Sequence, residues 1–99
     1  MDSTSLNMTL QKAIDLGEYD PKYLSTFPEW QGLSKHIQFE FIKTAIDNRR
    51  HQLVQQYAQI NNVLDFSLKP ELKQTLDNIH AQIKSLDTDF EKFSMEYFK

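Results

Sequence analysis

The chain has no cysteine and, among its 99 residues, only two glycines, three prolines and one tryptophan. The lack of cysteine excludes disulfides, thiolate nucleophiles and cysteine-based zinc sites. A chain rich in β-strands needs many tight turns, and glycine and proline are among the residues that form them. Their scarcity therefore predicts a few long helices.

Long apolar segments are also missing from the sequence. No apolar run approaches the roughly 20 residues that span a bilayer, and residues 1–7 have neither the basic nor the apolar region of a secretory signal. We therefore expect a cytoplasmic protein with no membrane partner. The net charge of −3 disfavours a general attraction to nucleic acid or to an anionic membrane surface.

The composition that remains suits a folded domain. Hydrophobic residues make up 39% of the chain and charged residues 25%, as in globular rather than disordered proteins. The length is that of one domain. We predict a single helical domain over residues 1–99, with residues 1–7 frayed, short helices within residues 8–33, and long helices over residues 35–62 and 70–98.

Capping signals mark the ends of the predicted short helices. Asn7 suits an N-cap and Gly17 suits the position after a helix end, which predicts a first helix over about residues 8–16. Asp20 followed by Pro21 predicts the start of a second short helix, which Pro28 stops. Pro28 begins a further turn, and Gly32 ends it.

The predicted long helices carry apolar residues at helical spacing. Ser34 caps the first, whose apolar positions recur three, four or seven residues apart: Ile37, Phe41, Ile42, Ala45, Ile46, Leu53, Tyr57, Ile60 and Leu64. Pro70 opens the second. Its apolar residues alternate at steps of four and three over about four heptads, forming the seam that we predict for core packing or assembly: Leu72, Leu76, Ile79, Ile83, Leu86, Phe90, Phe93 and Tyr97.

Two helices of matched length joined by a short connection predict an antiparallel, coiled-coil-like hairpin. Most aromatic residues lie either between Tyr19 and Phe41 or between Phe90 and Phe98. An antiparallel hairpin brings these two groups together at its open end. The predicted fold is therefore all-α, with two short N-terminal helices packed on the open end of the hairpin.

Two pairs of titratable residues stand four apart, His36 with Glu40 and Asp47 with His51. Such pairs can contribute to a metal site or to acid–base chemistry, but on a helix surface they are more often weakly stabilising contacts. The three histidines are far apart in sequence, although His51 and His80 can approach each other across a hairpin. We predict no catalytic residue, no metal ligand and no cofactor, and keep a small metal-dependent enzyme as an alternative.

Residues 47–51 are the most polar stretch of the first long helix, and Arg49 and Arg50 lie on or beside its apolar stripe. An arginine there must be paired or must extend to solvent. The favoured interpretation is an ion pair between one arginine and Asp87 or Asp77 of the last helix. The others are an exposed, uninvolved pair, or recognition of a phosphate or an acidic partner, which gives a nucleic-acid- or phosphate-binding module as a second alternative function.

The apolar stripe of the first long helix is wider than one neighbouring helix can bury. We therefore expect a protein partner or self-association, as a homodimer or four-helix bundle. The leading hypothesis is a non-enzymatic helical protein–protein interaction module, such as a small adaptor or regulatory subunit. Trp30 would be a contact if partly exposed, although the sequence favours aromatics that attach the short helices to the hairpin. The candidate interaction residues are Trp30, Lys43, Arg49, Arg50 and His51.

Overall fold

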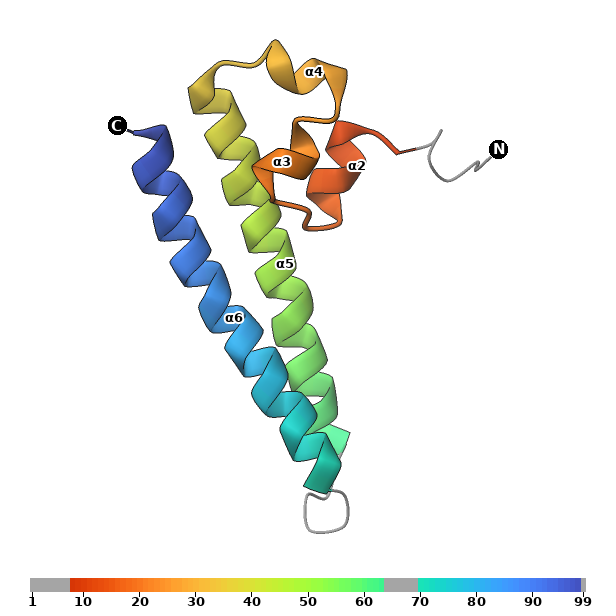
Figure 1. Ribbon diagram of the computed structural model, residues 1–99. Helices are drawn as coiled ribbons and strands as arrows, with labels where there is room; N and C mark the ends of the chain where they lie inside the picture. The colour runs from red at the N-terminus through yellow and green to blue at the C-terminus, as the bar shows by residue number, and fades with distance from the viewer. Residues whose placement is uncertain (1–7, 64–69, 99) are drawn as a thin grey trace.

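The computed structural model describes residues 8–63 and 70–98, and every regular element in these ranges is an α-helix (Figure 1). Three short helices precede two long ones: α2 (Leu10–Asp15), α3 (Pro21–Leu24), α4 (Pro28–Gln31), α5 (Lys35–Val63) and α6 (Pro70–Tyr97). The predicted all-helical class is therefore confirmed. The expectations for residues 1–7, which include the Asn7 cap, and for Leu64 and the connection between the long helices lie outside the described residues.

Local capping determines where the helices begin. The Thr9 side chain accepts a 3.1 Å hydrogen bond from the backbone N–H of Lys12, so α2 starts two residues later than predicted. Asp20 caps α3 in the same way, over 3.0 Å. Pro28 starts a separate helix, because a proline cannot continue the hydrogen-bonded turn that precedes it. Residues 8–33 therefore contain three short helices where the predicted fold has two, because the turn expected between Pro28 and Gly32 forms a helix of its own.

Gly17 ends α2 and has a left-handed backbone, with φ at +87°. Its N–H donates to the carbonyl of Ile14 and the N–H of Glu18 donates to that of Ala13, each over 2.9 Å, which is the Schellman arrangement. A Cβ atom on Gly17 would lie 3.1 Å from the Cα atom of Arg49 in α5. Glycine is therefore required here both by the backbone conformation and by the close approach of α5.

Helix α5 is the central element of the molecule. The short helices pack along one side of its first half and α6 packs along another side (Figure 1). The described structure measures 53 × 40 × 16 Å, so it is thin in one direction. Each long helix therefore has a side on which no other described helix lies.

The hydrophobic core is concentrated where the short helices meet the first half of α5. Its fully buried members come from α2, α3 and α5: Ala13, Ile14, Leu24, Ile42, Ala45 and Ile46. Along the second half of α5 the buried side chains are fewer and come from the two long helices alone: Leu53, Leu76, Ile79 and Leu86. The N-terminal helices thus complete the core in only one half of the molecule.

Helices α2 and α3 lie alongside the first half of α5, and α4 lies beside its start (Figure 1). The C-terminal end of α2 lies beside the middle of α5. Carbonyl groups there accept hydrogen bonds from side chains of α5. The ring of Phe39 packs against aromatic rings of the C-terminal segment, with centroid distances of 5.7 Å to Phe90 in α6 and 4.9 Å to Phe98 just after it. At this end Phe98 nevertheless remains 61% exposed and Met95 72% exposed.

Replacing Gly17 by alanine should lower the free energy of unfolding by about 2 kcal/mol or more. Both the left-handed backbone and the crowding against Arg49 oppose a Cβ atom. Gly32 is the matched control, because a Cβ atom there would meet only the Glu29 carbonyl, at 3.7 Å. Urea denaturation of Gly17→Ala and Gly32→Ala checks this, and equal stabilities of the two variants would contradict it.

Candidate functional site

Side chains in the polar stretch of α5, residues 47–51, form hydrogen bonds to the C-terminal end of α2. Asn48 Nδ2 donates to the Ile14 carbonyl at 2.9 Å and Arg49 Nε donates to the Gly17 carbonyl at 3.3 Å. One turn further, Gln52 Nε2 donates to the carbonyl of Leu16 at 3.1 Å. The last carbonyls of a helix have no partner within the helix itself. The polarity of this stretch therefore has a structural use, which is to satisfy the end of a neighbouring helix.

Both arginines of this stretch have carboxylate partners. Arg50 forms an ion pair with Asp87 of α6, one of the two acidic residues considered from the sequence. Arg49 faces the other way and lies 3.4 Å from a carboxylate oxygen of Glu18, in the segment that follows α2. The two side chains are equally exposed, at 35%. The arginines thus serve two different neighbours and do not converge on a common anion site.

The other predicted interaction residues are dispersed. Lys43 and His51 are exposed on α5. Trp30 is only 4% exposed and packs in the core, so the condition under which it would be a contact is not met, and its position agrees with the favoured role of attaching the short helices. Its burial follows from its place in α4, beside the start of α5, where Gln38 Nε2 donates to its backbone carbonyl at 2.9 Å.

The residues considered for metal binding do not assemble into a site. His36, Glu40, Asp47, His51 and His80 are all exposed. Across residues 8–63 and 70–98, there is no group of three or more histidine or acidic residues placed to hold a metal ion. His80 instead lies beside Tyr57, with ring centroids 6.5 Å apart.

Tyr19 forms a contact that the sequence analysis did not identify. Its hydroxyl donates to Asp89 of α6 at 2.7 Å, and its ring meets Phe93 edge-on with centroids 6.2 Å apart. Two hollows open to solvent, of about 280 and 340 Å³, adjoin Tyr19 and Arg49. Burial, together with the hydrogen bond and charge of Asp89, raises the pKa of Tyr19 to about 12. Such a phenol stays neutral at physiological pH, and its observed contacts attach the N-terminal segment to α6.

The predicted seam of α6 packs against α5 but is only partly covered. Leu76, Ile79 and Leu86 are buried. The other seam residues remain partly accessible, namely Leu72, Ile83, Phe90, Phe93 and Tyr97. The incomplete cover arises because α5 is the only long helix that packs along this stripe within the described residues.

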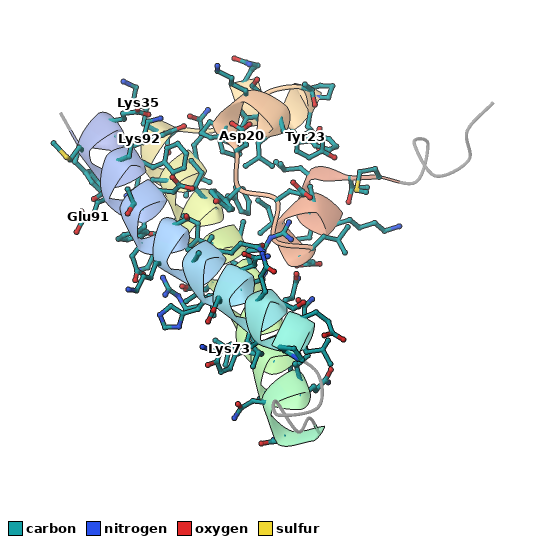
Figure 2. All side chains as sticks on the ribbon, turned by 60° about the horizontal axis from the view of Figure 1, so that its bottom comes forward. Asp20, Tyr23, Lys35, Lys73, Glu91 and Lys92 are labelled. Carbon is teal, nitrogen blue, oxygen red and sulfur yellow. The ribbon has the colours of Figure 1, made fainter. Side chains whose placement is uncertain are left out.

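The side of the long helices away from the short helices is called the uncovered face. Asp87 bonds to Arg50, whereas Asp89 bonds to Tyr19 of the N-terminal segment. Residues two positions apart on a helix are separated by about 200° around its axis. Asp87 and Asp89 therefore lie on opposite sides of α6. Figure 2 shows the same division, with Glu91 away from the short helices and Lys92 nearer to them. The uncovered face is formed by residues of both long helices that share the side of Arg50 and Asp87: Glu40, Lys43, Asp47, Arg50, Val54, His80, Asp87 and Glu91.

Replacing Asn48 by alanine should cost about 1 kcal/mol of stability, because the Ile14 carbonyl loses one of its two donors and keeps the Gly17 N–H. Asn62→Ala, an exposed position on the same helix, is the control and should change stability by less than about 0.5 kcal/mol. Thermal and urea denaturation followed by circular dichroism measure both. A loss at Asn62 as large as that at Asn48 would argue against the carbonyl interaction.

The pKa of Tyr19, raised from 10.0 to about 12, has a consequence for stability at high pH. A raised folded-state pKa means that folding favours the neutral phenol. That stabilisation is complete below pH 10, the unfolded value, and is lost as the pH rises toward 12. Titration of phenolate absorbance should show one tyrosine ionising near pH 12 that is missing in Tyr19→Phe.

Asp89→Asn provides a second arm for this titration. The substitution removes the carboxylate charge but leaves the burial of Tyr19, so the Tyr19 pKa should fall without returning fully to 10.0. An unchanged titration curve in this variant would show that Asp89 does not govern the pKa.

None of the helices within the described ranges combines the length and the apolar character needed to cross a membrane. Comparison of the chain with protein-family models, with curated proteins and with solved structures found no match. The functional proposal therefore rests on the sequence and on the geometry described above.

Proposed function

We propose that the protein is a non-enzymatic helical interaction module, such as a small adaptor or regulatory subunit, that associates with itself. The observation that carries this proposal is a set of large apolar side chains that stay exposed along and at the end of the long helices: Ile37, Val54, Met95 and Phe98. Packing against a second helical surface would remove such side chains from water.

The shape of the molecule accounts for the exposure of these side chains. The Cα radius of gyration is 16.5 Å, whereas a compact domain of this length has about 13 Å. Helices only one layer deep cannot enclose a core from all sides. Val54, Ile37 and Phe98 are accordingly 49%, 41% and 61% exposed. A second helical layer would cover such side chains, and this favours association through helical faces.

The long helices fit an antiparallel hairpin as the structural basis of the module. Three cross-helix contacts support this arrangement: Phe39 with Phe98, Arg50 with Asp87, and Tyr57 with His80. Residue numbers rise along α5 as they fall along α6. Two such hairpins pack naturally as a four-helix bundle, which is the assembly that we propose.

The interaction hypothesis is preferred to the two alternatives for specific reasons. Arg49 is engaged by the Gly17 carbonyl and by Glu18, and Arg50 is engaged by Asp87, which offsets the charge that an anion or nucleic acid would need. The residues proposed for a metal-dependent enzyme are dispersed along α5 and α6. Cytoplasmic localisation remains a prediction from the sequence.

Light scattering coupled to size-exclusion chromatography, over a concentration series, tests the proposal. The expected result is a mass of about twice the monomer value of 11.7 kDa, or a higher multiple for a larger bundle, that decreases on dilution. A constant mass of one chain up to millimolar concentration would contradict self-association. Chemical cross-linking at the same concentrations provides an independent measure of the number of chains.

A further inference from the structure

Four charged residues on α5 alternate in sign at helical spacing. They are Glu40, Lys43, Asp47 and Arg50, separated by steps of three, four and three residues. These steps keep all four side chains on one side of the helix, within about 80° of arc. Glu40, Lys43 and Asp47 are exposed, and Arg50 is partly exposed. The four residues are called the charge quartet below.

The charge quartet belongs to the uncovered face. Arg50, its last member, bonds to Asp87 there, whereas Asn48, Arg49 and Gln52 point to the short helices. The ion pairs among the described residues are those of Arg49 with Glu18 and of Arg50 with Asp87. Neither of them joins two members of the quartet, so the alternation is not used as a ladder of ion pairs along α5.

We propose that α5 packs antiparallel against α5 of a second copy, about a two-fold axis that passes midway between Lys43 and Asp47. This inference rests on the proposed function, since it names the face through which the protein associates. The charges of the quartet run negative, positive, negative, positive from Glu40 to Arg50. In the reverse direction each position has the opposite sign. The antiparallel arrangement places Glu40 opposite Arg50 of the second copy and Lys43 opposite Asp47 of the second copy, each twice by symmetry. A parallel arrangement in register would place like charges together.

Val54 also lies within the arc of the charge quartet and is 49% exposed. The two-fold axis places it opposite His36 of the second copy at each end, because both positions are equally far from the centre of the quartet. Ile37, which is 41% exposed, lies about 100° around the helix from Val54 and is outside this pairing. The interface thus has mixed charges at its centre, where they fix register and orientation, and Val54 with His36 at both ends. Arg50 keeps Asp87 and still has donors for Glu40 of the second copy.

Charge reversal at the two inner positions tests this pairing in the full chain. Lys43→Glu alone places two pairs of like charges across the axis, and so does Asp47→Lys alone. Each single variant should weaken the dimer by about tenfold or more in Kd, measured by sedimentation velocity. The double variant Lys43→Glu with Asp47→Lys restores opposite charges across the axis and should recover dimerisation. All these positions are exposed, so each variant is expected to fold, which circular dichroism checks.

A mixture of the two single variants gives the sharpest result. Lys43→Glu and Asp47→Lys chains complement each other at all four positions, so an equimolar mixture should form heterodimers under conditions in which each variant alone is monomeric. Gln56→Lys is the control, because it adds a charge on the opposite side of α5 and should leave the Kd unchanged. Native mass spectrometry separates the two chains if one carries a mass tag.

The outcomes distinguish this inference from the proposed function. A wild-type chain that stays monomeric would overturn both. A wild-type dimer that is unaffected by the single reversals, or a mixture with no preference for heterodimers, would overturn the α5 pairing and leave self-association intact. If Gln56→Lys weakened the dimer and Lys43→Glu left its Kd unchanged, the interface would lie on the other side of α5.

Discussion

The close approach of Gly17 to the backbone of Arg49 is the contact on which the rest of the structure depends. At this distance the last carbonyls of α2 come within reach of Asn48, Arg49 and Gln52, which satisfy them. The same contact directs the chain toward α6, where Tyr19 bonds to Asp89. By fixing which side of α5 the short helices occupy, it also determines which side stays open.

The two long helices differ because they have different numbers of neighbours. Helix α6 packs against one long helix, and a single heptad stripe is sufficient for this. Helix α5 contacts both α6 and α2, so its buried residues spread over a wider arc, about 120° from Ala45 to Phe39. The polar side chains at positions 48, 49 and 52 interrupt that arc, and they are stable there because backbone carbonyls accept their hydrogen bonds.

Local signals predicted much of the fold because the forces behind them are local. Asp20 before Pro21, Ser34 and Gly17 act through hydrogen bonds to residues a few positions away, and each is found in the expected role. The heptad stripe of α6 likewise reflects the period of the helix itself. Asp87 was among the partners considered for the arginines, because a charge beside an apolar stripe needs an opposite charge nearby.

Contacts between distant segments were beyond such reasoning. Nothing in the local sequence shows that Arg49 and its neighbours would bond to carbonyls of α2, or that Tyr19 would meet Asp89, because these depend on where α2 docks. The burial of Trp30 agrees with the favoured interpretation of the N-terminal aromatics, but its exact place is set by the path of the chain through α4 and not by any periodicity. Hydrogen bonds from side chains to the backbone are hard to predict from sequence, because the carbonyl of any residue can accept one.

The proposed pairing of α5 with a second copy would explain why one helix carries three kinds of surface. One side is apolar and faces α6, a second is polar and supports α2, and the third alternates in charge. Opposite charges three or four residues apart also stabilise a solvated helix slightly, but charges that face themselves across a two-fold axis must in addition reverse their sign about its centre. Glu40, Lys43, Asp47 and Arg50 meet that condition. Symmetry, more than hydrophobicity, is therefore the property of α5 that favours a second copy over an unrelated partner.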